Sequence, residues 1–125
     1  MKKRRPVAAL QISEAMSRIK TAHEIIASYE RHGWMLRRIL LRPSSRDEFK
    51  SNADAFPEAA LIDAEIDALW FARPSHDQRE AWELRLISET AYALFEAFEA
   101  DESDEEREDV RREMENRMRE HTVGN

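Results

Sequence analysis

The stretch LWFARPSHDQREAWELRL, residues 69–86, decides how the middle of the chain folds. Apolar and aromatic residues dominate residues 66–73, and Pro74 then prevents further strand pairing on that side because it lacks an N–H group. After the polar residues 75–79, hydrophobic and charged side chains alternate over residues 80–86, with the period of a half-buried strand. Two such runs joined by a short polar turn predict an antiparallel hairpin whose tryptophans lie on the core face of a sheet.

Upstream of this hairpin, the sequence predicts a long helix and a further strand. Hydrophobic side chains recur at spacings of three and four over residues 10–32, which is typical of an amphipathic helix. Gly33 ends that helix, since glycine readily adopts the left-handed conformation at this position. Residues 34–41 are compatible with a strand, and the irregular alternation at Arg37-Arg38 indicates a bulge or an edge strand.

The remaining elements are a short helix, a further strand and a charged C-terminal helix. Residues 45–48 have the spacing of a capping box, which predicts one or two helical turns, and residues 51–59 predict a loop. Residues 90–99, TAYALFEAFE, fit a strand by their aromatic side chains and a helix by their alanines, and we interpret them as a strand. A second capping box at residues 103–106 begins the C-terminal helix, whose first turns are acidic.

Together these elements predict an α+β fold, in which a long N-terminal helix packs on a small, mostly antiparallel sheet of three or four strands. The helices are expected to cover one face of that sheet, with the tryptophans and phenylalanines between the layers. A chain of 125 residues has the size of one domain. We assign residues 1–9 to a basic N-terminal arm, residues 10–121 to a single α+β domain and residues 122–125 to a frayed tail.

Composition excludes several classes of site. The chain has no cysteine, which excludes disulfides and thiolate chemistry. It has two glycines, too few for the glycine-rich loops that hold nucleotide phosphates. No apolar run approaches the roughly 20 residues that a membrane-spanning helix needs. We therefore expect a cytoplasmic protein with no cofactor, no metal and no membrane contact.

Charge is divided unevenly along the chain. Residues 1–46 contain 11 Lys and Arg against 3 Asp and Glu, whereas residues 47–125 contain 9 against 23, which together give the net charge of −6. Such asymmetry is typical of a basic or an acidic segment that meets a partner. It also arises when the two halves fold together and neutralise each other, within one chain or across a dimer, and we favour that interpretation.

The tripeptide Arg-Pro-Ser occurs twice, in LRPSSRDE at residues 41–48 and in ARPSHDQRE at residues 72–80. If the two preceding strands ended at the same edge of the sheet, the arginines and serines of both turns would converge. Guanidinium groups and helix-start N–H groups at that edge would suit a phosphate or a carboxylate. The alternative is that Arg-Pro-Ser only ends strands and that its arginines pair with nearby acids. The candidate anion site consists of Arg42, Ser44, Arg46, Arg73, Ser75 and Arg79.

Acidic and histidine residues give weaker indications of a site. Asp63, Glu65 and Asp67 alternate with apolar residues, which favours the solvent-facing side of an extended segment over a cation site. Residues 76–80 contain a histidine and carboxylates, but the sequence supplies no evident third ligand for a metal. We predict that these are solvated turn residues.

Nothing in these patterns favours catalysis, and we expect a non-enzymatic interaction or adaptor module that self-associates as a homodimer. A sheet edge or the C-terminal helix would form the interface, and the narrow apolar seam of that helix is the candidate: Val110, Met114 and Met118. One alternative is an anion or small-ligand binder that uses the Arg-Pro-Ser turns. The other is a nucleic-acid-associated regulator that uses the basic N-terminal third, which begins with Lys2, Lys3, Arg4 and Arg5.

Overall fold

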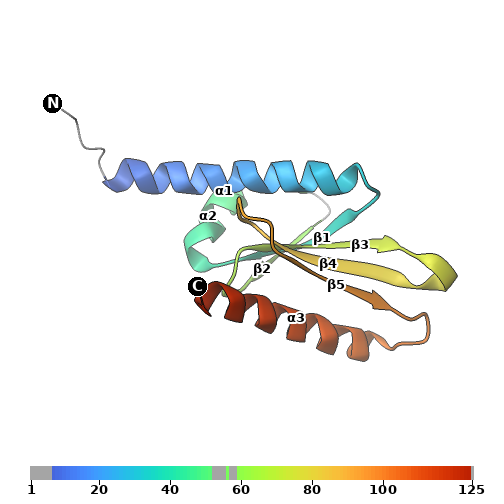
Figure 1. Cartoon of the computed structure of the whole chain (residues 1–125). Coiled ribbons are helices and arrows are strands. Elements are labelled where there is room, and N and C mark those ends of the chain that lie inside the picture. Colours follow the sequence, from blue (N-terminus) through green and yellow to red (C-terminus); the bar gives the residue numbers. More distant parts are fainter. Residues whose placement is uncertain (1–6, 52–55, 57–58, 125) are drawn as a thin grey trace.

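A computed structural model of the chain describes the backbone of residues 7–51, 56 and 59–124, and their side chains except those of residues 7–17 and 124. A long helix stands at each end of this part of the chain, with the strands between them (Figure 1). A 3-10 turn, His76–Gln78, joins the third strand to the fourth. The elements are α1 (Val7–Glu30), β1 (Met35–Leu41), α2 (Pro43–Ser51), β2 (Ala60–Asp63), β3 (Ala68–Pro74), β4 (Glu80–Leu86), β5 (Ala93–Phe98) and α3 (Asp104–Gly124).

The two ends of the predicted domain differ from the structure. α1 begins at Val7, earlier than predicted, and residues 1–6 of the predicted arm lie outside the described residues. α3 runs to Gly124, so residues 122–124 continue a helix and the frayed tail is not seen there. The predicted loop at residues 51–59 also lies largely outside the described residues.

The described strands form one five-stranded sheet in the order β2-β1-β3-β4-β5. The pairs β1-β3, β3-β4 and β4-β5 are antiparallel, whereas β2 pairs with β1 in parallel. The α+β class and the mostly antiparallel pairing are confirmed, but the predicted number of three or four strands is wrong. The sequence pattern missed β2 because it is only four residues long and does not alternate. Its parallel pairing requires a crossover connection, which contains α2.

The predicted hairpin is confirmed in detail. β3 and β4 pair over their whole length, with Ala72 opposite Trp82. The ambiguous segment 90–99 contains β5, which extends the same antiparallel meander. The register of β1 against β3 shifts between Leu36 and Arg38, where the sequence predicted a bulge or an edge strand; β1 has a neighbour on each side, so the bulge is the correct alternative.

Helices cover both faces of the sheet: α1 lies above it in Figure 1 and α3 below it. The prediction that they cover one face is wrong, because the central strands are apolar on both sides. Leu69 and Trp70, for example, are adjacent in β3 and both fully buried. Since successive strand residues point to opposite faces, each face needs its own cover.

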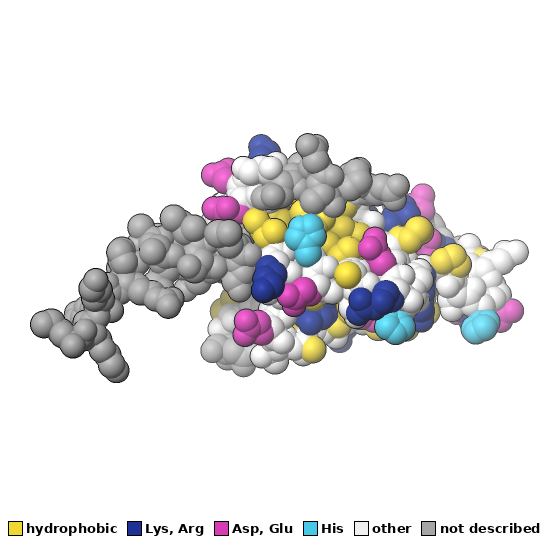
Figure 2. All heavy atoms as spheres, turned by 90° about the horizontal axis from the view of Figure 1, so that it is seen from above, with side chains coloured by type: hydrophobic (Ala, Val, Ile, Leu, Met, Phe, Trp, Pro, Cys, Tyr) yellow, Lys and Arg dark blue, Asp and Glu magenta, His cyan; other side chains and the backbone are white. Residues whose placement is uncertain are grey.

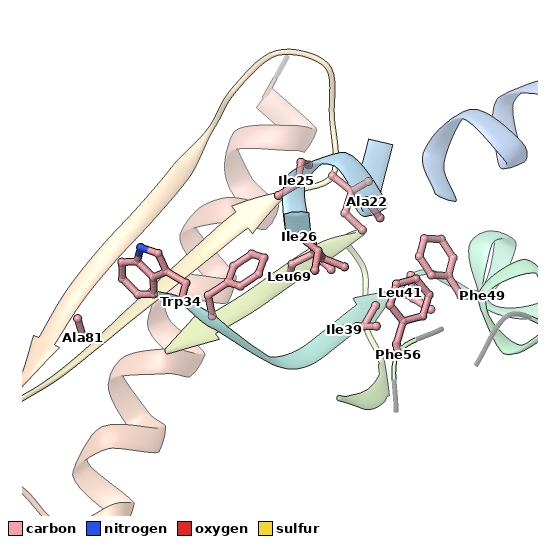
Figure 3. Close-up of a cluster of buried hydrophobic side chains, with 12 residues drawn as sticks. Ala22, Ile25, Ile26, Trp34, Ile39, Leu41, Phe49, Phe56, Leu69 and Ala81 are labelled. Carbon is pink, nitrogen blue, oxygen red and sulfur yellow. The ribbon is translucent and has the colours of Figure 1, made fainter. Parts of the chain in front are cut away.

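The core on the α1 side joins α1 and α2 to the sheet (Figure 3). Ile25 and Ile26 of α1 belong to the same buried cluster as Ile39 of β1 and Leu69 of β3. Each of these side chains removes apolar surface from water, worth about 1.5–3 kcal/mol when burial is complete. This core therefore holds the second half of α1 against the sheet.

The core on the α3 side contains the methionines that we predicted as an interface. Met114 and Met118 are 2% and 0% exposed and pack with Trp70 and Trp82, and Val110 lies partly buried beside them. The seam of α3 therefore contacts the sheet of its own chain and is not available to a second copy. The tryptophans do not share one layer either, since Trp34 belongs to the core on the α1 side.

Gly33 ends α1 as the sequence predicts. Its φ angle is +84°, and the N–H groups of Gly33 and Trp34 donate to the carbonyl oxygens of Glu30 and Tyr29, at 3.1 Å each. These two bonds are the pair that defines a Schellman motif, which satisfies carbonyl groups of the last helical turn.

We expect Gly33→Ala to lower the free energy of unfolding by about 1 kcal/mol, because a Cβ atom disfavours this left-handed backbone. No heavy atom lies within 4 Å of the position that the Cβ would take, so no steric clash adds to the cost. Urea denaturation followed by circular dichroism measures the loss. Gly33→Asn should lose less, since asparagine tolerates the conformation, and equal losses in the two variants would contradict this explanation.

Candidate functional site

The two Arg-Pro-Ser turns lie at opposite ends of the sheet. β1 and β3 are antiparallel neighbours, so Leu40 pairs with Ala68 near one end and Met35 with Ala72 near the other. The first turn follows the end of β1, and the second turn follows the opposite end of β3. The prediction that their six residues converge on one anion site is therefore wrong, because it required both strands to end at the same edge.

At the first end, the arginines pair with acids that we predicted to face solvent. Arg46 Nη1 lies 2.9 Å from the carboxylate of Asp63. The backbone N–H of Arg42 donates to Asp67 Oδ1 at 2.8 Å, and its guanidinium lies 3.3 Å from Oδ2. Ser45 Oγ donates to the same carboxylate at 2.8 Å. Asp67 is 5% exposed, so its predicted place on a solvent-facing side is wrong.

At the second end, the arginines are also engaged. Arg73 donates to the carbonyl oxygen of His32 at 2.7 Å, and its guanidinium lies 4.5 Å from the centre of the Trp34 ring. Arg79 Nε lies 2.9 Å from the carboxylate of Glu99. These contacts fit the alternative interpretation, in which Arg-Pro-Ser ends strands and its arginines find local partners.

The serines of these turns do not act as predicted either. α2 begins at Pro43, so Ser45 lies inside the helix and its hydroxyl contacts Asp67. Ser75 precedes the 3-10 turn without a side-chain capping bond. Ser44 and Ser75 are both exposed, at opposite ends of the sheet.

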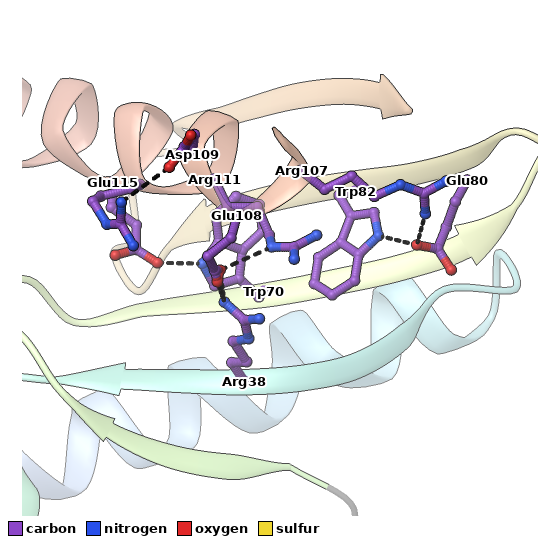
Figure 4. A network of polar contacts seen from close by, with 10 residues as sticks. Arg38, Trp70, Glu80, Trp82, Arg107, Glu108, Asp109, Arg111 and Glu115 are labelled. Carbon is purple, nitrogen blue, oxygen red and sulfur yellow. Dashed lines mark hydrogen bonds and ion pairs between the residues drawn. The ribbon is translucent and has the colours of Figure 1, made fainter. Parts of the chain in front are cut away.

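Charged side chains join α3 to the sheet (Figure 4). Arg38 of β1 donates to Glu108 at 2.9 Å, and Glu108 also pairs with Arg111 at 3.2 Å. The Arg111 guanidinium lies 4.4 Å from the centre of the Trp82 ring. Burial disfavours the charged form of Glu108, but the bonds and charges of the two arginines outweigh it and hold the pKa of the carboxyl below its ordinary value of 4.5.

The indole groups beneath α3 have partners as well. Trp70 Nε1 donates to Glu115 at 2.8 Å, and Trp82 Nε1 donates to Glu80 at 2.6 Å. Arg107 lies 3.3 Å from the same Glu80 carboxylate. This network satisfies the indole N–H donors of both tryptophans and holds α3 on the sheet, so we assign it a structural role. The ion pair between Arg38 and α3 joins the basic first third of the chain to its acidic remainder, as the intramolecular interpretation of the charge asymmetry expects.

The sheet has two edges, and they are protected to different degrees. β2 has four residues, and ion pairs flank it: Asp63 with Arg46, and Glu65 with Arg119 of α3, each at 2.9 Å. Short length and flanking charge are two ways in which natural proteins block edge pairing. β5 has six residues, ALFEAF, without lysine, arginine or proline. The β5 edge is therefore the less protected of the two.

The pairing of β5 with β4 shows which backbone groups of β5 point outward. The N–H of Leu86 donates to the carbonyl oxygen of Tyr92 at 3.0 Å, so Tyr92 faces β4. Residues 94, 96 and 98 then face β4 too, since hydrogen-bonded positions alternate along an antiparallel ladder. Within the described part of the chain, no backbone hydrogen bond outside helices and ladders involves the three residues that point away from β4: Ala93, Phe95 and Ala97.

Glu99 closes this edge at its end. Its N–H donates to the carboxylate of Glu102 at 2.8 Å, and its carbonyl oxygen accepts from Arg107 at 2.7 Å. The available backbone groups therefore end at Ala97. We call Ala93, Phe95 and Ala97 the open edge.

The side chains of the open edge lie on the face of the sheet that α1 covers elsewhere. Phe95 is 57% exposed, and its ring meets that of Trp34 edge-on, with 6.3 Å between the ring centres. Phe95 is not among the residues predicted from the sequence, because apolar residues occur at both alternating positions of the segment. A phenylalanine on the second face of a strand without lysine or proline is the signal that was available.

Comparison with protein-family models, with curated proteins and with solved structures finds no match to this chain. Among the described residues, no three His, Asp or Glu side chains are grouped so that they could hold a metal ion. The helices described here also lack the combination of length and apolar character that crossing a membrane requires. The open edge, with its outward-pointing backbone groups and the exposed Phe95 ring, is the candidate functional site.

Proposed function

We propose that this chain is a non-enzymatic interaction module that self-associates through its open edge, by antiparallel pairing of β5 with β5 of a second copy. The observation that supports this function is the unused hydrogen-bonding capacity of Ala93, Phe95 and Ala97. An unprotected edge strand presents a row of N–H and C=O groups that another strand can pair with. A second copy supplies a strand of matching length and pattern, and such a pair is symmetric, as most dimer interfaces are.

The position of Glu96 limits the registers in which two β5 strands can pair. Two carboxylates directly opposite each other destabilise a strand pair, so the Glu96 residues of the two copies must be offset. An antiparallel pair centred on Phe95 places Glu96 opposite Leu94, Ala93 opposite Ala97, and the two Phe95 rings side by side. A pair centred on Leu94 also separates the carboxylates, but it leaves each Phe95 ring opposite an alanine. We propose the register centred on Phe95, because it buries the two exposed rings against each other.

A proline scan distinguishes the two sides of β5. Ala97→Pro removes an N–H that points away from β4, so we expect the fold to persist and the dimer to weaken at least about tenfold through lost and unsatisfied hydrogen bonds. Glu96→Pro removes an N–H that points toward β4, so it should lower the melting temperature instead. Sedimentation equilibrium measures the mass, which is 14.7 kDa for one chain, and circular dichroism follows unfolding.

Ile62→Lys is the matched control, because Ile62 is an exposed apolar residue at the other edge of the sheet. It should leave the dimer intact, whereas Phe95→Lys should dissociate it. A wild-type chain that sediments as a monomer at every concentration would overturn the proposal. A dimer that Ala97→Pro and Phe95→Lys leave unchanged would overturn it as well.

Cysteine cross-linking reads the register directly, because the chain has no cysteine of its own. A single cysteine at position 95 should form an intermolecular disulfide under oxidising conditions, since paired residues place their Cα atoms within disulfide reach. A single cysteine at position 97 should not, because its own copy lies far along the partner strand. Cross-linking at position 97 in preference to 95 would contradict the register centred on Phe95.

A further inference from the structure

A polar cleft of about 580 Å³ lies between α1 and the end of β4. This size is in the range of clefts that bind small molecules. It belongs to a single chain, so it does not depend on the pairing of β5. One wall comes from the second half of α1, and the other comes from β4 and the loop that follows it. The cleft is lined by residues that include Lys20, Thr21, Ser28, Tyr29, Arg85 and Ser88.

Two cations in this cleft have no acidic partner among the residues that the structure describes. Arg85 is half-buried and its Nη1 donates to the carbonyl oxygen of Leu86, but among the described residues no carboxylate forms an ion pair with it. Lys20, on the facing wall, has no ion pair within the described part of the chain either. The half-buried Arg38 and Arg107 pair with carboxylates, and the half-buried Arg73 lies against the Trp34 ring. Arg85 has neither kind of partner within the part of the chain that the structure describes.

Glu83, an acid on the same strand face, forms no ion pair with Arg85. Glu83 stands two residues away, but its carboxylate accepts a hydrogen bond from the hydroxyl of Tyr29. Burial, together with this bond and the negative charge of Glu83, raises the pKa of Tyr29 above its ordinary value of 10.0, so the hydroxyl keeps its proton at neutral pH. The carboxylate of Glu83 is therefore bonded to Tyr29, and the guanidinium N–H groups of Arg85 other than the one bonded to Leu86 are available to another anion.

The rest of the cleft is hydrophilic. Thr21, Ser28 and Ser88 contribute hydroxyl groups, which donate and accept hydrogen bonds. The exposed acids Glu24 and Glu89 also line it, and they disfavour a large polyanion such as a nucleic acid. On the α1 side of the molecule, side chains of both charges lie interspersed around a group of hydrophobic ones (Figure 2). Among the described residues, that face shows no continuous basic surface.

We propose that this cleft binds a small hydrophilic molecule that carries one phosphate or carboxylate group and hydroxyl groups. Arg85 holds the anionic group through its remaining N–H donors, since the guanidinium fork matches both kinds of oxyanion. Lys20 adds a second positive charge from the facing wall. The hydroxyl side chains of Thr21, Ser28 and Ser88 bond to the hydroxyl groups of the ligand.

Three probes with one carbon skeleton test the proposal: glycerol 3-phosphate, glycerate and glycerol. We expect glycerol 3-phosphate, glycerate or both to raise the melting temperature in a saturable manner, and glycerol at equal concentration to have no such effect. The anion that gives the larger shift identifies the preferred group. Absence of a saturable shift with both anions, or an equal shift with glycerol, would overturn the proposal.

Matched variants locate the binding. Arg85→Gln should weaken the binding of the active probe at least about tenfold in calorimetric titration, because it removes a charge-assisted contact. Arg37→Gln, at an exposed arginine of β1 outside the cleft, should leave the affinity unchanged. Lys20→Gln alters an exposed side chain that the fold does not need, so it provides a second measurement if Arg85→Gln unfolds, and it should also weaken binding. Unchanged affinity in either cleft variant would overturn the assignment.

Discussion

Replacing Asp67 by alanine will lower the free energy of unfolding by about 2 kcal/mol or more, because it leaves the buried Ser45 hydroxyl and the Arg42 backbone N–H without their acceptor. The Asp67 carboxylate accepts from the backbone N–H of Arg42 and from Ser45, and the guanidinium of Arg18 lies 3.8 Å away. It therefore links the middle of α1, the end of β1 and the first turn of α2 at a point just before β3 begins. Without it, the fully buried Ser45 hydroxyl loses its acceptor, whereas the guanidinium groups of Arg42 and Arg18, 49% and 26% exposed, can still be hydrated. Urea denaturation measures the loss.

Asp63→Ala is the matched control for this variant. Asp63 belongs to the same alternating run of acids and also pairs with an arginine, but both side chains of that pair are exposed, at 44% and 66%. Pairs of this kind contribute about 0–1 kcal/mol, so the control should lose less than about 1 kcal/mol. Similar losses in the two variants would show that the Asp67 cluster does not hold these elements together.

Met118→Ala will lower the free energy of unfolding by about 2–5 kcal/mol, the usual cost of truncating a fully buried methionine. The side chain is 0% exposed and packs with Met114, Trp70 and Trp82 between α3 and the sheet. The loss has two parts: the hydrophobic stabilisation that the removed side-chain atoms no longer contribute, and the cost of the cavity that they leave. Thermal and urea denaturation at low protein concentration measure it without a contribution from association.

Val123→Ala is the control on the same helix, because Val123 is 80% exposed. It should change the free energy of unfolding by no more than about 0.5 kcal/mol. The original interpretation of the methionine seam as an interface makes a different prediction, a change of mass at constant stability. Observing that result for Met118→Ala would contradict the packing of α3 described here.

Local patterns predicted the elements better than they predicted the arrangement. The alternation from Glu80 to Leu86 and the glycine at position 33 each gave the observed structure, because a strand period and a helix end depend on a few neighbouring residues. The segment 90–99 was assigned correctly as well, although its propensities were balanced. β2 was missed, because a four-residue strand forms by pairing with its parallel neighbour and is too short to show a recognisable pattern of its own.

The site predictions failed where they needed the order and direction of strands. The repeated Arg-Pro-Ser turns look alike in sequence, but antiparallel pairing of β1 with β3 sends them to opposite ends. Asp67 resembles Asp63 in the alternating run, yet it is buried, because β3 begins beside α2 and the end of β1 at that point. The open edge and the cleft at Arg85 both depend on which strand is outermost and where α1 stops. Neither property is encoded in a short window of sequence.

The division of the interior into two separate cores gives each helical layer its own fluorescent reporter. Trp34 emits from the side of α1, and Trp70 and Trp82 emit from the side of α3. Variants that retain tryptophan on only one side would follow the loosening of one helix at a time during denaturation. If the two unfolding curves coincide, both helices unfold together with the sheet. If they differ, one helix detaches first.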